Sequence, residues 1–499
     1  MPVHYIIICF FVLDDFLDIK ENAMELKGKK VLFARICGTG VSSLAIICKR
    51  SGANVIGTDL EYYPPVSTKL EEEKIPCYPM EKFFDLVKEE KPDLIVVGNA
   101  LNGKSEEAAF IMKCGIPYYS MPSLMEDFLL DGKSPVVISG THGKTTTTTV
   151  FSEVLAGIGR NPSYMIGGIP EFSGTNAAFS EGAGYFVIEG DEYDTAFFDK
   201  GPKFLHYKPE TTIVTSIEFD HADIYDSVES IFKNFKKLVE ITKKRVILSL
   251  DFDHNLRLRE FIPEDKLFTY SISDKSADLF VKFEERHGKL MYFSATFKNG
   301  EKYFFETPLF GMQNLMNLGA LVSFLKCEGF DLKDTKILET IKTLKGIKRR
   351  QEYLGSINGG LIYSDFAHHP TAVKLTLESF IDFFPEKKIN VVFDPATNSN
   401  GQNVFEKQYT EIFKKADKVV IGFPPKAFKF PPENRFEPER VVATINAETP
   451  DKAVYLKDIN DTVSWVKANS SKDTVTVIMS NSGFDGFFGA IADFFDNQR

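Results

Sequence analysis

One stretch of this chain is the most informative about its fold: Pro135-Val136-Val137-Ile138-Ser139-Gly140-Thr141-His142-Gly143-Lys144-Thr145-Thr146. The β-branched run at its start predicts a buried strand. Beyond the stretch, apolar residues recur at helical spacing, at Val150, Phe151, Val154, Leu155 and Ile158. A buried strand that leads through a short loop into a helix is the repeating unit of α/β folds.

The loop inside this stretch has the chemistry of a phosphate-binding site. Gly140 and Gly143 allow a tight turn that points backbone N–H groups at an anion. Lys144 supplies a charge for terminal phosphates, and Thr145 supplies a hydroxyl for a magnesium ion. Ile138 stands where the usual G-x-x-x-x-G-K-[ST] pattern has its first glycine, and a Gly/Thr-rich loop that binds nothing is the alternative interpretation. We expect a nucleoside triphosphate site. Its residues would be Gly140, Thr141, His142, Gly143, Lys144, Thr145 and Thr146.

Two acidic clusters follow strand-like runs downstream of the loop. The run at 185–188 leads into Glu189-Gly190-Asp191-Glu192-Tyr193-Asp194, and the run at 212–215 leads toward Glu218-Phe219-Asp220-His221-Ala222-Asp223. Ligands of open α/β sheets gather at the carboxyl ends of strands, where these clusters would lie. Either cluster alone could be a solvated acidic loop. Their occurrence behind one phosphate loop favours metal–phosphate chemistry.

A second glycine loop lies nearer the N-terminus, after the strand-like run at 31–34. It reads Gly38-Thr39-Gly40-Val41-Ser42-Ser43, and a further strand-like run at 54–57 ends close to Asp59. This is the dinucleotide-binding fingerprint with Ser43 in place of its third glycine. A ligand loop and a plain strand–turn–helix are equally compatible with the pattern.

Strand-like and helix-like runs alternate in three segments, which predicts an α/β protein of three domains. The predicted boundaries are 24–132, 133–345 and 346–499, with 1–23 as an N-terminal extension if translation starts at Met24 rather than Met1. We expect Rossmann-like first and third domains. The central domain is predicted to be a P-loop ATPase domain with a mainly parallel sheet.

The bulk composition narrows the class of protein. The chain has 499 residues and a formal net charge of −11, which argues against a general nucleic-acid surface. Its six cysteines show no metal-ligand spacing, as is typical of a reduced cytoplasmic protein. The apolar run near the N-terminus lacks a basic leader, and no run reaches the length of a membrane span. We therefore expect a cytoplasmic enzyme with no nucleic-acid or membrane partner and leave its oligomeric state open.

Taken together, these blocks resemble the Mur ligases of bacterial cell-wall synthesis, from residue 28 to the C-terminus. Two shared motifs are the phosphate loop and Asp365-Phe366-Ala367-His368-His369-Pro370-Thr371. Two other blocks resemble the branch of the family that adds a recovered peptide rather than L-alanine. These are Tyr193-Asp194-Thr195-Ala196-Phe197-Phe198-Asp199-Lys200 and Met479-Ser480-Asn481-Ser482-Gly483-Phe484.

The resemblance implies an ATP-dependent carbon–nitrogen ligase of peptidoglycan recycling. The lactyl carboxylate of UDP-N-acetylmuramate would attack the γ-phosphate of ATP to give an acyl phosphate. The amine of the tripeptide L-Ala-γ-D-Glu-meso-diaminopimelate would then displace phosphate. Lys144 would hold the β- and γ-phosphates, Thr145 one Mg²⁺ ion, and Glu189 with His221 a second one. Such positive charge is needed because two anions must meet.

The resemblance also implies roles for residues outside the loop. Asn314 would contact adenine, Arg350 would reach the γ-phosphate, and Asp365 would bind ribose. His368 and His369 would face the central cleft, although a His pair before proline is as often structural. The UDP moiety would bind at Gly38, Thr39, Gly40 and Asp59.

Four positions depart from the family pattern. Ser364 replaces an acid, Ser216 an asparagine, and Arg35 a glycine. Ala396 replaces an arginine of the domain that receives the peptide. Three functions are therefore weighed: the tripeptide ligase, an L-alanine ligase with the same chemistry, and a catalytically silent nucleotide-binding regulator.

Overall fold

The structure is a computed structural model and describes residues 25–62, 66–182, 184–219 and 225–496. These residues fold into two compact units. The first contains the described parts of 1–135, 177–186 and 193–209, and the second contains those of 136–176, 187–192 and 210–499. Three segments of the predicted central domain, residues 133–135, 177–186 and 193–209, thus belong to the first unit. The predicted extension 1–23 lies outside the described residues.

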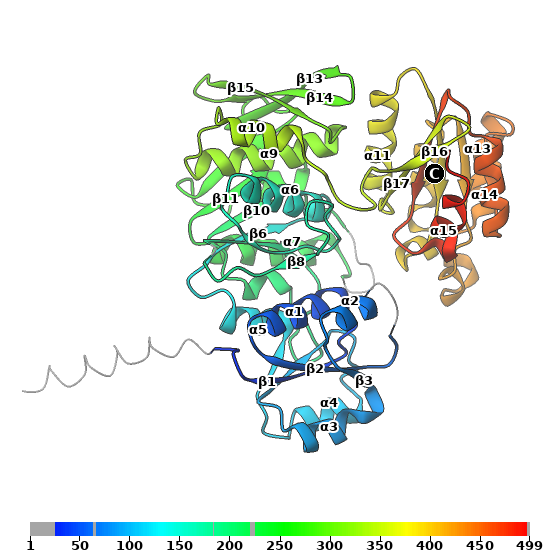
Figure 1. The fold of residues 1–499 in the computed structure, drawn as a ribbon. Helices are drawn as coiled ribbons and strands as arrows, with labels where there is room; N and C mark the ends of the chain where they lie inside the picture. The colour runs from blue at the N-terminus through cyan, green and yellow to red at the C-terminus, as the bar shows by residue number, and fades with distance from the viewer. Residues whose placement is uncertain (1–24, 63–65, 183, 220–224, 497–499) are drawn as a thin grey trace, which may run out of the picture. The chain divides into compact units, whose positions relative to one another are not determined.

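The first unit is built on a parallel sheet in the order β3-β2-β1-β4-β5. Its strands are β1 (Lys30–Ala34), β2 (Asn54–Asp59), β3 (Cys77–Pro79), β4 (Leu94–Val97) and β5 (Tyr118–Ser120). The short β8 (Ala177–Ala178) also falls in this unit but is not a strand of this sheet. Its helices are α1 (Thr39–Arg50), α2 (Val66–Glu72), α3 (Phe83–Glu90), α4 (Glu106–Ile111) and α5 (Met121–Phe128). Helices cover both faces, with α3 and α4 on the face of Leu32 and Ala34 (Figure 1). This is a Rossmann-like layer arrangement.

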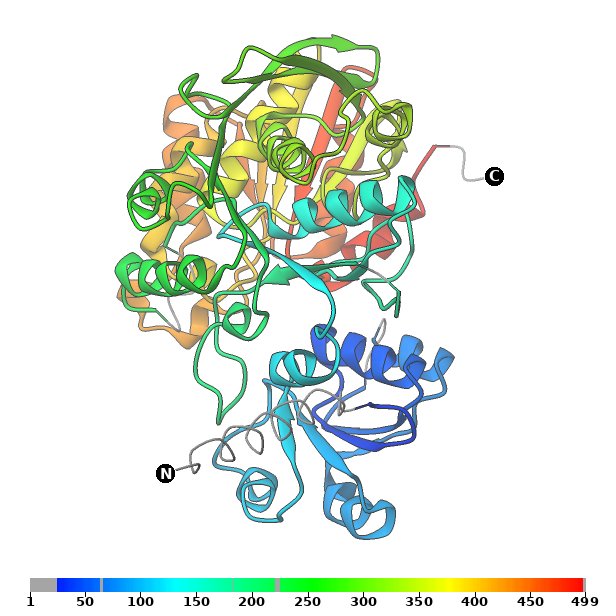
Figure 2. The same cartoon turned by 90° about the vertical axis from the view of Figure 1, so that its left-hand side faces the viewer.

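The second unit contains two sheets, and the phosphate loop belongs to the first of them. The strand order there is β15-β14-β13-β12-β11-β10-β6-β9-β7. The neighbours β6, β10, β11 and β12 run parallel, whereas β13, β14 and β15 form antiparallel pairs. The helix α6, which follows the phosphate loop, packs against α9 (Figure 2).

The elements around this sheet have the following bounds. The strands are β6 (Ser134–Ser139), β7 (Ser163–Met165), β9 (Tyr185–Gly190), β10 (Thr211–Val214), β11 (Arg245–Ser249), β12 (Leu267–Ser271), β13 (Leu279–His287), β14 (Leu290–Phe297) and β15 (Lys302–Thr307). The helices are α6 (Lys144–Gly157), α7 (Val228–Ile241), α8 (Asp253–Arg259), α9 (Met312–Cys327) and α10 (Thr335–Lys342).

The C-terminal part of the second unit carries the other sheet, in the order β16-β17-β21-β18-β19-β20. Its strands are β16 (Glu352–Ile357), β17 (Gly360–Asp365), β18 (Lys388–Phe393), β19 (Lys418–Ile421), β20 (Ala453–Tyr455) and β21 (Thr474–Met479). Its helices are α11 (Pro370–Phe383), α12 (Glu406–Phe413), α13 (Pro438–Glu448), α14 (Ile459–Ala468) and α15 (Phe487–Ala492). Alternate residues of β18 face opposite layers: Val391 packs with α11–α13, and Val392 packs with α14 and α15.

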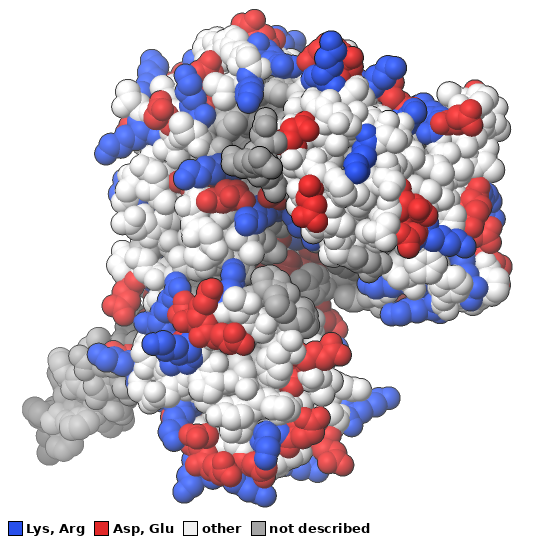
Figure 3. Space-filling model, turned by 45° about the vertical axis from the view of Figure 1, so that its right-hand side comes forward, with Lys and Arg blue, Asp and Glu red and all other residues white. Residues whose placement is uncertain are grey.

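The predicted fold class is confirmed, because each predicted segment contributes one α/β sheet. Among the described residues, no helix is both long and apolar enough to cross a membrane. On the face drawn in Figure 3, basic and acidic side chains are interspersed, with no broad basic surface of the kind that attracts nucleic acid.

Candidate active site

The phosphate loop joins β6 to α6, and two glycines make its shape possible. Gly140 and Gly143 have φ of 140° and 81°. A Cβ on Gly140 would lie 2.1 Å from Thr215 Oγ1, and a Cβ on Gly143 would lie 2.7 Å from Asn317 Oδ1. Because α6 begins at Lys144, the loop presents the positive end of a helix and its N–H groups, with Thr146 in the first turn.

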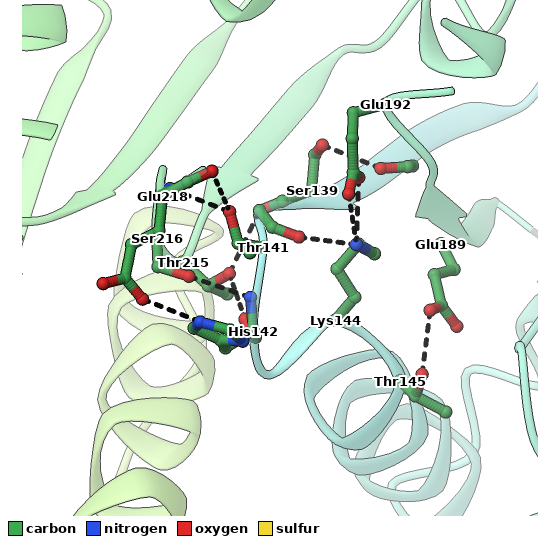
Figure 4. Close-up of polar contacts among 12 residues, drawn as sticks. Ser139, Thr141, His142, Lys144, Thr145, Glu189, Glu192, Thr215, Ser216 and Glu218 are labelled. Carbon is green, nitrogen blue, oxygen red and sulfur yellow. Dashed lines mark hydrogen bonds and ion pairs between the residues drawn. The ribbon is translucent and has the colours of Figure 1, made fainter. Parts of the chain in front are cut away.

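Lys144 is held between the loop and a carboxylate that follows β9 (Figure 4). Its Nζ donates to Gly140 O at 2.6 Å and forms an ion pair with Glu192 Oε2 at 2.9 Å. Burial alone would lower the pKa of Lys144, but the negative charges of Glu192, Asp191 and Glu189 outweigh it and raise the pKa. The ammonium group is therefore charged at neutral pH, as a ligand for phosphate must be.

Thr145 and Glu189 together offer oxygen ligands for a metal ion. Thr145 Oγ1 donates to Glu189 Oε1 at 2.8 Å, and Gly167 N donates to Glu189 Oε2 at 2.6 Å. Burial and the charge of Asp191 raise the pKa of Glu189, while Lys144 opposes them. A hydroxyl beside a half-buried carboxylate fits Mg²⁺, which prefers hard oxygen ligands. His221, the third predicted ligand, lies outside the described residues.

A cavity of about 300 Å³ lies beside the segment that leads from α10 into β16. This volume is at the lower end of the range for small-molecule sites. Among the residues that line it are Phe310, Ile347, Arg350, Gln351 and Tyr353. The cavity thus brings apolar and aromatic side chains next to a guanidinium, as a nucleoside with a phosphate chain requires.

Hydrogen bonds join this cavity to α6 through Asn314. The Asn314 Nδ2 donates to Gln351 Oε1 at 2.9 Å. Asn317 Nδ2 donates to Asn314 Oδ1 at 3.2 Å, and Thr147 Oγ1 donates to Asn317 Oδ1 at 3.0 Å. The predicted adenine contact, Asn314, is thereby linked to the helix that carries the phosphate loop.

Arg350 and Asp365 interact electrostatically at the start of the C-terminal part. The Arg350 guanidinium lies 4.6 Å from the ring centre of Phe366, and its pKa is lowered by burial, against the charges of Asp365 and Glu189. Burial raises the pKa of Asp365, which accepts from Gln351 N at 2.9 Å and Ala367 N at 2.8 Å. Asp365 therefore braces the backbone beside Arg350, and its contact with ribose stays a prediction.

Thr141 and His142 contact the segment that follows β10. Glu218 N donates to Thr141 Oγ1 at 2.8 Å, and His142 N donates to Ser216 Oγ at 2.9 Å. His142 Nε2 lies 2.7 Å from Glu218 Oε2. Burial would raise the pKa of Glu218, but the hydrogen bond from His142 and the charges of His142 and His369 lower it. Ser216, a departure from the family pattern, thus fixes the backbone of the loop.

The two predicted cleft histidines have different surroundings. His369 precedes α11, and its ring centre lies 5.0 Å from that of His142 and 5.0 Å from that of Phe405. The Nδ1 of His368 lies 2.9 Å from Phe366 O. The structure therefore brings His369 to the phosphate loop and places His368 against its own chain.

In the first unit, the predicted UDP loop leads into α1. Gly38 precedes the helix, Thr39 and Gly40 start it, and a Cβ on Gly40 would lie 2.9 Å from Met121 Sδ. The carboxylate of Asp59 accepts from Cys37 N at 2.7 Å and pairs with Arg35 at 3.1 Å. Arg35 has a φ of 68°, a conformation that glycine adopts most easily, so the family's glycine there has a physical reason. Asp59 therefore stabilises the loop through its contacts with Arg35 and Cys37, and its contact with substrate stays a prediction.

Sequence reasoning did not assign several of these partners. Glu192 was part of a predicted acidic cluster, but its pairing with Lys144 comes from the fold. Asn317 stands three residues after Asn314, a spacing that places both on one helix face and could have revealed it. The contacts of Glu218 with Thr141 and of Gln351 with Asn314 join segments far apart in sequence, so local sequence patterns could not predict them.

Three family models match the chain. "Mur ligase family, catalytic domain" matches residues 30–132, "Mur ligase middle domain" matches 138–324, and "Mur ligase, glutamate ligase domain" matches 349–482. Each of the three sheets lies largely within one of these matches.

Relatives and solved structures agree with these matches. A UDP-N-acetylmuramate–L-alanyl-γ-D-glutamyl-meso-2,6-diaminoheptandioate ligase from Haemophilus influenzae is 30% identical over 480 residues, 93% of this chain and 99% of its own. A UDP-N-acetylmuramate–L-alanine ligase from Streptococcus gordonii is 32% identical over 396 residues, 78% of this chain and 82% of its own. The crystal structure of a murein peptide ligase from Psychrobacter arcticus is 26% identical with a TM-score of 0.65, covering 95% of this chain and 100% of its own. A UDP-N-acetylmuramate–alanine ligase from Thermotoga maritima, 19% identical, shares the fold with a TM-score of 0.74 over 93% of this chain and 98% of its own. The chain belongs to the Mur ligase family.

Proposed function

We propose that the protein is a murein peptide ligase that uses ATP and Mg²⁺ to join UDP-N-acetylmuramate to L-Ala-γ-D-Glu-meso-diaminopimelate. One observation carries the ligase chemistry. Lys144 and Thr145 of the phosphate loop face Glu192 and Glu189 at the end of β9. In sequence, the Haemophilus influenzae relative named for tripeptide addition matches 93% of this chain and the Streptococcus gordonii L-alanine ligase matches 78%, although the fold of the Thermotoga maritima L-alanine ligase covers 93%.

In this proposal the nucleotide lies along a line of groups within the second unit. The base occupies the cavity beside Asn314 and Gln351, and Arg350 on the wall of that cavity faces the phosphates. The N–H groups of the loop and the charge of Lys144 bind the β- and γ-phosphates. Arg350 also interacts electrostatically with Glu189. The guanidinium on the wall of the base cavity is therefore within electrostatic range of a predicted magnesium ligand.

The chemistry requires a carboxylate to approach the γ-phosphate of ATP, and both are anions. Lys144 and Arg350 reduce the repulsion and stabilise the charge that develops on the transferred phosphoryl group. A magnesium ion bound by Thr145 and Glu189 would neutralise further charge there. The resulting acyl phosphate would react with the amine of the incoming peptide and release phosphate.

The test is phosphate release by the purified full-length protein. With ATP, Mg²⁺ and UDP-N-acetylmuramate present, adding the tripeptide should raise phosphate release well above the rate without amine. A larger increase with L-alanine would favour the L-alanine ligase. If ATP binds and no amine raises phosphate release, the protein is a silent nucleotide-binding relative and the proposal fails.

A further inference from the structure

Three metal-ligating side chains from separate parts of the second unit converge beside the phosphate loop. They are His142 in the loop, Glu218 after β10 and His369 before α11. One ligand atom from each lies within 4.8 Å of the others. The predicted magnesium ligands Thr145 and Glu189 are not members of this cluster.

Hydrogen bonds from outside the cluster fix the backbone of His142 and the side chain of Glu218. The backbone of His142 is fixed on both sides, since its N–H donates to Ser216 Oγ at 2.9 Å and its carbonyl accepts from Thr215 Oγ1 at 2.6 Å. Glu218 Oε1 accepts from Thr371 Oγ1 at 3.2 Å. A hydrogen bond to a ligating carboxylate, such as that of Thr371 to Glu218, orients ligands in established metal sites and raises metal affinity.

An ion can be accommodated with movements of about 1 Å, because the ligand atoms all lie within 4.8 Å of one another. His142 Nε2 and Glu218 Oε2 lie 2.7 Å apart, and the ring centres of His142 and His369 lie 5.0 Å apart. Ligand atoms of a tetrahedral Zn²⁺ site, with bonds of about 2.1 Å, are separated by roughly 3.4 Å. The His142–Glu218 pair therefore needs to open by less than about 1 Å.

The donor set selects the kind of ion. Two imidazoles and one carboxylate suit Zn²⁺ or Co²⁺, whereas Mg²⁺ prefers oxygen ligands throughout. The two imidazoles are shielded from water, since the His142 side chain is 8% exposed and His369 is 8% exposed, whereas the Glu218 side chain is 29% exposed. We propose that His142, Glu218 and His369 bind a borderline divalent cation of the zinc type, separately from the magnesium site.

Such an ion would connect two parts of the second unit. His142 belongs to the loop between β6 and α6, and His369 starts the helix α11 of the C-terminal part. An ion that binds this arrangement and not the unfolded chain stabilises it by mass action. Zn²⁺ should therefore raise the thermal stability of the protein even without nucleotide.

The test is Co²⁺ titration of the chelator-treated full-length protein, because low-coordinate Co²⁺ has a visible absorption band. The unaltered protein should give the band at one equivalent. His369→Gln and Glu218→Gln should weaken binding at least tenfold. Two controls should retain the band: Glu189→Gln at the predicted magnesium site, and His254→Gln in α8, outside the cluster. Zn²⁺ should raise the Tm of the unaltered protein and leave that of His369→Gln unchanged.

The proposal is overturned if the unaltered protein gives no band, if His369→Gln retains it, or if Glu189→Gln abolishes it. A second measurement needs no variant. X-ray absorption by the one-equivalent Co²⁺ complex should show two imidazole ligands. A spectrum with one imidazole or with oxygen ligands alone would place the ion elsewhere.

Discussion

Lys144 shows how one residue is prepared for its role by its surroundings. Its Nζ contacts the loop carbonyl of Gly140 and the carboxylate of Glu192, and the nearby acids raise its pKa. A charge held in this way stabilises a phosphoryl group most in the transition state, where negative charge is redistributed.

Replacing Lys144 with alanine should therefore abolish most of the turnover. We expect kcat to fall at least about a hundredfold, because the lost interaction acts mainly in the transition state. Steady-state phosphate release measures the effect, with Lys243→Ala at an exposed position as the control. A near-normal rate in Lys144→Ala would mean that this loop is not the catalytic site.

Gly143 offers a second test at the residue scale. Gly143 and Gly159 have φ of 81° and 80°, so alanine at either costs about 1–2 kcal/mol of backbone strain. A Cβ meets Asn317 Oδ1 at 2.7 Å at Gly143 and nothing within 4 Å at Gly159. Gly143→Ala should displace Asn317, which links Thr147 to Asn314.

The expected result is a loss of ATP affinity of at least tenfold in Gly143→Ala and a normal affinity in Gly159→Ala. Calorimetric titration with a non-hydrolysable ATP analogue measures both. Equal affinities in the two variants would show that the Asn317 contact does not shape the nucleotide site.

At the scale of elements, α6 connects the phosphate loop to the segment before β16 through a buried acid. Glu153 is 7% exposed, and its Oε1 accepts from Lys345 N at 3.0 Å. Burial raises the pKa of Glu153 to about 7, against the opposing hydrogen bonds from Lys345 and Gly346. The ordinary pKa of a glutamate is 4.5.

This raised pKa makes stability fall as pH rises. Below the ordinary pKa of 4.5, Glu153 is protonated in both the folded and the unfolded protein and does not lower the free energy of unfolding. Between pH 4.5 and about pH 7, Glu153 is deprotonated in the unfolded chain but still protonated in the folded protein, so the free energy of unfolding falls as pH rises. Above about pH 7 the buried carboxylate is charged in the folded protein as well, and the loss of stability reaches its full size of up to about 3 kcal/mol. Glu153→Gln removes that cost, so its Tm should exceed that of the unaltered protein by a few degrees near pH 8 and by much less near pH 5. Thermal unfolding across pH measures this, with exposed Glu240→Gln as the control. A difference that does not vary with pH would contradict the account.

The elements also show what sequence can predict. Strands such as β6, β18 and β21 are rich in β-branched and apolar residues, and the glycines of the phosphate loop mark a turn, so local patterns predict them. The antiparallel β13–β15 region was not predicted, because its alternating pattern depends on which face is covered. The pairing of Lys144 with Glu192 and of Thr147 with Asn317 was also beyond prediction. Such contacts depend on how distant segments pack.

At the scale of the whole molecule, the proposed substrates are divided between the units. The UDP loop of Gly38, Thr39 and Gly40 belongs to the first unit, and the nucleotide site belongs to the second. Gly40→Val should raise the KM for UDP-N-acetylmuramate, because a Cβ there already lies 2.9 Å from Met121 Sδ, while ATP affinity stays normal. Gly182→Val, in open space of the same unit, is the control. An unchanged KM would remove this loop from the substrate site.

The identity of the amine decides between the tripeptide ligase and its relatives. Ala396, where the family pattern has an arginine, lies in the domain predicted to receive the peptide and is buried three residues after β18. Because this substitution lies where the peptide is predicted to bind, the identity of the amine substrate is the part of the proposed function that most needs a direct test.

The most direct measurement is a competition at equal concentrations of tripeptide and L-alanine, with ATP, Mg²⁺ and UDP-N-acetylmuramate, followed by mass spectrometry of the nucleotide-linked product. We predict that UDP-N-acetylmuramoyl-tripeptide will be the main product and that its formation will require ATP. A main product that carries L-alanine alone, or no amide product at all, would contradict the account.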